Sequence, residues 1–108
     1  MLIIIAEMVV GNASDAEKLS AAAVEVATHT RKEAGCVHYT FSRDVDDGNI
    51  IRVIELWQDE NAIKAHMRTP HLGKFIEQLS SIEMTTTATM FDGINERDPS
   101  SLMSELAS

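Results

Sequence analysis

The chain has 108 residues, 44% of them hydrophobic and 24% charged, which is the composition of one soluble globular domain. Its formal net charge of −8, with scattered basic residues, argues against nucleic acid or an anionic membrane as a partner. The single cysteine, Cys36, excludes an intrachain disulfide and is expected to be a small packed strand residue. Because no targeting segment and no apolar run of bilayer length is visible, we expect a cytoplasmic protein.

The first two predicted elements are a strand and an alanine-rich helix. Residues 2–10 are dense in isoleucine and valine, which favours a central strand buried on both faces. The stretch "GNASDAEK" breaks this run, and Ser14 with Glu17 fits a capping box at the start of a helix. Gly35 is predicted to end that helix as a left-handed cap.

Two further strands follow, joined by the turn sequence "DDGN". Residues 36–44 alternate in polarity, which is the strand period. Residues 50–58 place Glu55 and Trp57 on one face, while the opposite face is also largely apolar. We therefore expect both faces of this strand to be covered.

The second helical region is predicted in two parts. Asp59 can cap a short helix that runs to Met67. Thr69 as N-cap and Pro70 at the first helical position then begin a new helix. Residues 82–91 alternate and are β-branched, which predicts a fourth strand. The order β-α-β-β-α-β predicts an α+β fold of the ferredoxin-like split type.

The predicted sheet has one face without helices. That face is too apolar to stand in water alone, so we predict a homodimer that packs sheet on sheet. Residues 1–91 form the predicted domain, and residues 92–108 form a polar tail. The tail can fold as a short amphipathic helix, and we expect it to contact the partner subunit.

The stretch "ELWQDENAIKAHMRTPH", residues 55–71, resembles the antibiotic biosynthesis monooxygenase (ABM) family of dimeric α+β barrels. The matching residues are Glu55, Trp57, Asp59, Glu60, Ala62, Ile63, His66, Thr69, Pro70 and His71. The upstream "EAGCVHYTFSRD", residues 33–44, resembles the strand-two signature of the family. The resemblance covers residues 2–91 and implies a pocket between helices and sheet in each subunit. It indicates the fold more specifically than the reaction, because similar domains perform several chemistries.

The resemblance also implies a range of activities. Many members oxygenate quinols or polyphenols with O₂ and without metal, haem or flavin, so no cofactor is expected. One subset degrades haem, but the places of its required asparagine, tryptophan and histidine hold Met8, His66 and Ile76 here. The strand-three asparagine of the aromatic-polyketide branch is replaced by Val53. A further subset with a similar "TPH" segment isomerises a small phosphorylated sugar derivative.

His66 is the predicted catalytic residue. Reaction with O₂ without a metal needs a substrate anion, and histidine is the side chain whose unperturbed pKa suits a general base. Ile63 should face the sheet, so His66, three positions later, should lean the same way. The alternative is a histidine at the edge of the core that bonds a backbone carbonyl.

Four other side chains are predicted substrate contacts: Trp57, Tyr39, His71 and Phe75. For Trp57 the alternative is an anchor in the core or the dimer interface. His71 either meets an anionic substrate group at a helix N-terminus or is solvated. Glu55 is predicted to be structural or orienting, and to bond a histidine, Arg52 or Arg43, because a carboxylate inside a strand needs a partner.

No metal site is expected on the histidines. His66 and His71 are five positions apart, which is about 500° around a regular helix, so they would not share a face. A helix restart also separates them, and His29 and His38 add no ligand spacing. Three functions stay open: a cofactor-independent monooxygenase of a quinol or small polyphenol, an acid–base isomerase of a small polar metabolite, and a non-catalytic ligand-binding dimer.

Overall fold

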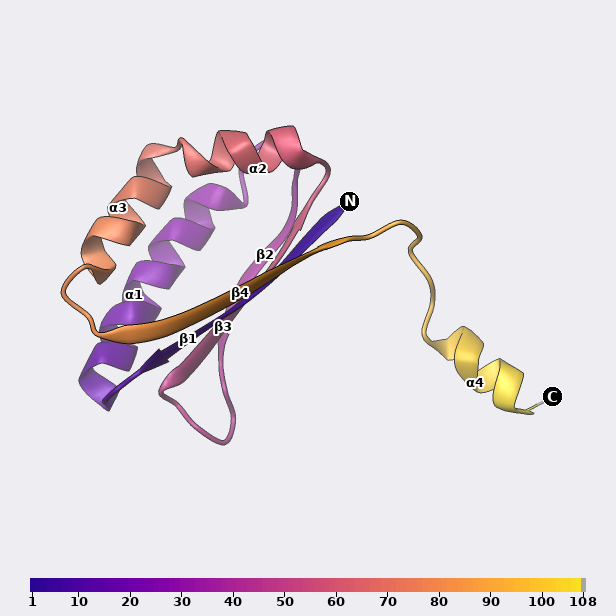
Figure 1. The fold of residues 1–108 in the computed structure, drawn as a ribbon, viewed down its shortest axis with the longest axis horizontal. Coiled ribbons are helices and arrows are strands. Elements are labelled where there is room, and N and C mark those ends of the chain that lie inside the picture. The colour runs from indigo at the N-terminus through magenta and orange to yellow at the C-terminus, as the bar shows by residue number, and fades with distance from the viewer. Residues whose placement is uncertain (108) are drawn as a thin grey trace.

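The computed structural model describes residues 1–107 as a four-stranded antiparallel sheet with helices packed on one face (Figure 1). The strands are β1 (Leu2–Val10), β2 (Cys36–Arg43), β3 (Ile50–Trp57) and β4 (Met84–Asp92). The helices are α1 (Ala13–Thr30), α2 (Glu60–Met67), α3 (Pro70–Leu79) and α4 (Ser100–Ala107). The predicted ferredoxin-like α+β fold is confirmed, and no helix within residues 1–107 is long and apolar enough to cross a membrane.

The strand order is β2-β3-β1-β4, and each neighbouring pair is antiparallel. β1 is therefore central, as predicted, and Ile4 lies opposite both Glu55 of β3 and Met90 of β4. One face of β1 is buried under the helices through Met8 and other residues. Its other face is not buried within one chain, because Ile5 there keeps 44% of its surface exposed.

The start of α1 differs from the prediction. Asn12 is the N-cap, and its Oδ1 accepts the backbone N–H of Asp15 at 2.8 Å. Asn12 Nδ2 in turn donates to Asp15 Oδ2 at 3.2 Å, so both side chains contribute to the cap. Ser14 and Glu17, the predicted capping pair, already lie inside the helix.

Gly35 has the predicted positive φ, 85°, but it does not cap the helix. α1 ends at Thr30 with Arg31 as C-cap, and Gly35 lies in the following loop. This loop packs against the start of α2, where a Cβ on Gly35 would come 2.6 Å from the Cβ of Ala62. Gly35 is therefore needed for two reasons, the backbone conformation and the close approach to α2.

The split second helical region is confirmed. Asp59 caps α2, with its Oδ1 accepting the Ala62 N–H at 2.9 Å, and Thr69 and Pro70 begin α3. α1 and α3 lie against each other over the sheet, and α2 crosses its end (Figure 1). The most deeply buried large side chains between these layers are Trp57, Leu19, Ile51 and Val26.

The second sheet face is open in the single chain. Ile54 and Phe91 are exposed there by 43% and 51%. The polar end of this face holds Arg52, whose guanidinium pairs with Glu7 at 2.9 Å and Asp44 at 2.7 Å. After β4 the chain leaves the sheet and α4 stands away from the other elements (Figure 1). Its apolar side chains Leu102, Met103 and Leu106 are exposed.

Candidate functional site

A cavity of about 410 Å³ lies between α2, α3 and the helix-covered face of the sheet. Its wall is mainly apolar, because all four strands contribute aliphatic, thioether or aromatic side chains. Representative apolar lining residues are Ile4, Ala6, Met8, Phe41, Val53 and Met90. The ionisable lining residues are Tyr39, Glu55 and His66. Such a lining suits a largely apolar small molecule with few polar groups.

His66 lies on the inner face of α2 and is only 4% exposed, as its spacing from Ile63 predicted. Its ring contacts Trp57 and Tyr39, with centroid distances of 4.8 and 5.5 Å. Nδ1 lies 2.7 Å from Oε2 of Glu33. When Glu33 is ionised it only accepts hydrogen bonds, so Nδ1 carries the proton and Nε2 has the lone pair. Nε2 is then the unprotonated ring nitrogen, on a side chain that lines the cavity.

Glu33 was not predicted as a site residue. It lies in the loop between α1 and β2, and its side chain is 13% exposed. The same Oε2 atom that meets His66 also lies 2.8 Å from Nε2 of His71. The one signal for Glu33 in the sequence was that the family's strand-two signature, residues 33–44, begins at this residue. A carboxylate that holds both histidines is the central feature of this site.

The expectation that His66 and His71 would lie apart is wrong. The helix break at Thr69 and Pro70 was predicted correctly, but it turns α3 so that both imidazoles reach the Glu33 carboxylate. The two ring centroids are 6.2 Å apart. The angle calculated for one regular helix does not apply across this break. One donor atom from each of the three side chains lies within 4.8 Å of the others, a separation that a metal ion can bridge.

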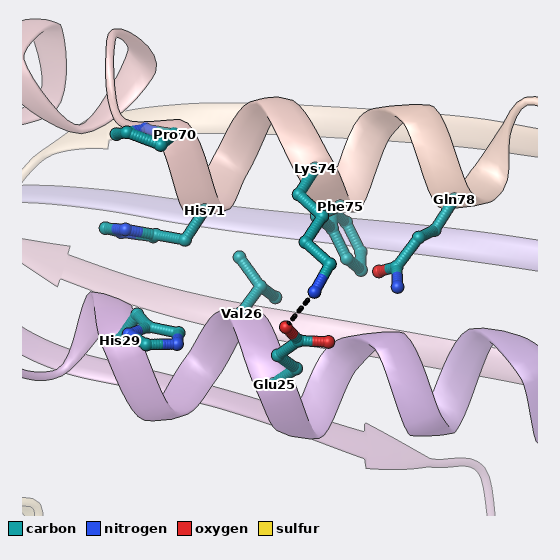
Figure 2. Close-up of a pocket in the computed structure, with 8 residues that line it drawn as sticks. All are labelled: Glu25, Val26, His29, Pro70, His71, Lys74, Phe75 and Gln78. Carbon is teal, nitrogen blue, oxygen red and sulfur yellow. Dashed lines mark hydrogen bonds and ion pairs between the residues drawn. The ribbon is translucent and has the colours of Figure 1, made fainter.

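His71 is largely buried and does not line the main cavity. Its side chain is 20% exposed and lines a second hollow of about 310 Å³ between α1 and α3. Figure 2 shows His71 opposite His29, and the rings stack at a centroid distance of 5.5 Å. Farther along this hollow Lys74 of α3 forms an ion pair with Glu25 of α1. His71 therefore joins the Glu33 carboxylate to the outer surface of the helix layer.

Trp57 lies behind the wall of the main cavity. It is 0% exposed and its ring is edge-on to Tyr39 at 6.3 Å. This placement corresponds to the core-anchor alternative, since Tyr39 and His66 separate Trp57 from the cavity. Tyr39 itself lines the cavity, and its burial, with Glu55 and Glu33 nearby, raises the pKa of its hydroxyl. Phe75 lines both hollows.

Glu55 has a partner that was not predicted. Its Oε1 accepts the indole N–H of Trp57 at 2.9 Å, two residues along the same strand face. Arg52 and Arg43, the proposed cationic partners, instead pair with other carboxylates. Burial raises the pKa of the Glu55 carboxyl, and the nearby Glu33 adds to this effect. Glu55 thus fixes the indole and presents a polar edge to the cavity.

The fold and the cavity define a class, a ferredoxin-like α+β domain with a small-molecule site between helices and sheet. The family model described as antibiotic biosynthesis monooxygenase matches residues 1–78, which is most of the chain. The chain belongs to this family, as the motif around Trp57 indicated.

Solved structures described as members of this family share the fold. A candidate antibiotic biosynthesis monooxygenase from Deinococcus radiodurans superposes with a TM-score of 0.83 at 24% identity, covering 91% of this chain and 97% of that chain. SnoaB from Streptomyces nogalater, a cofactor-independent oxygenase, gives a TM-score of 0.74 at 18% identity, covering 88% and 94%. At these identities the likeness establishes the fold alone.

Curated relatives match only part of their length. YcnE of Bacillus subtilis, whose name describes it as a candidate monooxygenase, is 32% identical over 60 residues, or 56% of this chain. The matched stretches span 63% of YcnE and 33% of the protein sll1783 from Synechocystis. These matches support the family without identifying a substrate.

Proposed function

We propose that this chain is a cofactor-independent monooxygenase that oxidises a quinol or small polyphenol with O₂. The observation that carries the proposal is His66, whose Nδ1 is 2.7 Å from the Glu33 carboxylate and whose ring lines an apolar cavity. A histidine oriented by a carboxylate is a general base with a fixed tautomer. The family membership and the cofactor-independent oxygenase SnoaB, which shares the fold, add support.

In this proposal the substrate lies in the main cavity with an acidic O–H or C–H group near Nε2 of His66. Nε2 accepts that proton, and the Glu33 carboxylate stabilises the resulting imidazolium. The substrate anion, held among apolar side chains, then transfers electrons to O₂. One oxygen atom forms a bond to substrate carbon, and the other leaves as water with two substrate hydrogens. An anthrone is thereby converted to an anthraquinone and one water molecule, which balances atoms and electrons.

The aromatic wall supports a flat substrate. Phe41 and Tyr39 pack edge to face at 5.6 Å, and Phe75 lies 5.7 Å from Phe41. All three side chains line the cavity, so one ring system can contact several aromatic edges. Trp57 contributes indirectly by supporting Tyr39 and His66 from behind.

The functional unit in this proposal is a homodimer. The open sheet face carries exposed Ile5, Ile54 and Phe91, which a second copy packed sheet on sheet would cover. The tail that follows residue 91 contains α4, and its exposed apolar side chains are suited to pack against the partner subunit.

The test is O₂ uptake by the purified chain with a chelator present and anthrone or a dihydroxynaphthalene as substrate. His66→Ala should lower the rate by about 10²–10⁴, which is the usual contribution of a general base. Lys64→Ala is the matched control, because Lys64 is exposed on the helix that carries His66. Absence of O₂ uptake across the substrate panel, or full activity of His66→Ala, would contradict the proposal.

Acid–base isomerisation is the second candidate function. The same Glu33–His66 pair can remove a proton next to a carbonyl, and this step requires no O₂. Turnover of a small hydroxyketone under anaerobic conditions, lost in His66→Ala, would favour this alternative.

A further inference from the structure

We propose that Glu33, His66 and His71 together form a binding site for one divalent transition-metal ion of the Zn²⁺ type. Nδ1 of His66 and Nε2 of His71 both lie next to Oε2 of Glu33, and one donor atom from each of the three side chains lies within 4.8 Å of the others. They come from three parts of the chain: Glu33 lies in the loop before β2, His66 in the last turn of α2, and His71 in the first turn of α3. The site is separate from the substrate cavity, although His66 belongs to both.

The donor set suits such an ion. Two imidazole nitrogens with one carboxylate oxygen bind Zn²⁺ in many proteins and leave a fourth position for water. The Glu33 oxygen lies 2.7 Å from the His66 nitrogen and 2.8 Å from the His71 nitrogen. Neighbouring ligands around a tetrahedral zinc ion are about 3.3 Å apart, so these contacts need to open by about 0.5 Å. Small side-chain rotations supply this movement without a change of fold.

The charge balance also favours a cation. The side chains of His66, Glu33 and His71 are only 6%, 13% and 20% exposed, so the carboxylate is largely shielded from water. Within residues 1–107, the ion-pair partners of Glu33 are these two histidines, which are charged only when protonated. A divalent ion would neutralise the carboxylate with both imidazoles in their neutral, coordinating form.

We expect an ion to reach this site past His71. Of the three ligands, His71 alone lines the hollow between α1 and α3, and Figure 2 shows it there beside Pro70 and opposite His29. The side chain of His71 is 20% exposed, and we expect water on this side to supply the fourth ligand. Access from the outer surface means that metal binding does not require an empty substrate cavity.

Metal binding has a consequence for catalysis, and this step rests on the proposed function. An ion on Nδ1 of His66 forces the ring proton onto Nε2, the atom proposed to accept the substrate proton. The metal-bound protein would therefore lack its general base. The site would act as an inhibitory one, and a chelator would restore activity.

The first test is calorimetric titration of the full chain with Zn²⁺ alone at neutral pH, without substrate. One ion per chain is expected, and His71→Ala or Glu33→Gln should weaken binding by more than about 100-fold, since each removes a ligand. His38→Ala is the matched control and should bind as the unaltered chain does. Circular dichroism verifies that each variant is folded.

The second test uses the unaltered chain and identifies the ligating atoms. Nitrogen chemical shifts of the imidazoles, recorded by NMR, should show zinc on Nδ1 of His66 and Nε2 of His71. No binding, binding unchanged in His71→Ala, or loss of binding in Cys36→Ser would overturn the proposal. Because both tests omit substrate, a failure of the proposed oxygenase leaves their outcome intact, and the reverse is also true.

Discussion

Replacement of Gly35 by alanine tests how closely the loop between α1 and β2 packs against α2. A non-glycine residue in the left-handed region costs about 1–2 kcal/mol, and Gly35 has φ of 85°. The new Cβ would lie 2.6 Å from the Cβ of Ala62, an overpacking that costs about 1–3 kcal/mol. Alanine also reduces the conformational entropy of the unfolded chain, which offsets about 0.4–1 kcal/mol of this loss. We therefore expect Gly35→Ala to lower the free energy of unfolding by about 1–5 kcal/mol.

The assay is urea unfolding followed by the fluorescence of Trp57, at one fixed protein concentration. Ala62→Gly should destabilise the unaltered chain by about 1 kcal/mol, but should cost little or restore stability in the Gly35→Ala background, where it removes the clash. Gly73→Ala is the control, because a Cβ there meets no atom within 4 Å and alanine favours the helix. A loss below about 0.5 kcal/mol in Gly35→Ala, or equal effects of Ala62→Gly in both backgrounds, would refute the reasoning.

Three further perturbations test the site and the open sheet face. Burial raises the pKa of Glu55, so the stability that the protonated carboxyl provides is lost as pH rises through that pKa. Glu55→Gln should therefore stabilise the protein more at pH 7 than at pH 4. Equal effects at the two pH values, measured by urea unfolding, would contradict this. Trp57→Phe removes the indole N–H that donates to the Glu55 carboxylate, and it should lower the free energy of unfolding by about 1–3 kcal/mol at neutral pH in urea. Little or no loss of stability would mean that this hydrogen bond is unimportant. Ile54→Lys should convert the proposed dimer to monomers in sedimentation experiments, and a persisting dimer would place the interface elsewhere.

The fold was predictable because its signals are local. Strand alternation, the Asp59 cap and the Thr69-Pro70 restart each depend on neighbours within a few residues, and the structure contains all three. The start of α1 was misplaced by a similar local ambiguity, since "GNASDAEK" offers two polar residues that are each followed by an acid three positions later. Asn12 with Asp15 forms the cap, and local sequence does not distinguish this pair from Ser14 with Glu17.

The site was less predictable because its contacts are distant in sequence. Glu33 lies 33 positions from His66 and 38 from His71, and no short motif joins them. The Glu55–Trp57 bond was different, because residues two apart on a strand share a face and a carboxylate there needs a donor. The strand period was sufficient to predict that contact, although a histidine or arginine partner was expected instead.

The stacked pair His29 and His71 shows a second limit of local reasoning. The two histidines lie 42 positions apart in the sequence, and they meet only because α1 and α3 pack together. Histidine spacing along the chain contains no information about such a pair. Helix packing, rather than sequence interval, decides which imidazoles share a surface.

The separation of α4 from the rest of the fold has a consequence for how assembly can be followed. A helix of eight residues is too short to persist by itself in water, since nucleation is costly and few hydrogen bonds repay it. We therefore expect its order to depend on a surface that covers Leu102, Met103 and Leu106. If that surface belongs to a second copy, helix formation in the tail and association of the chains become one equilibrium. Dilution would then unwind α4 while leaving the sheet intact, and amide exchange would reveal the two parts separately.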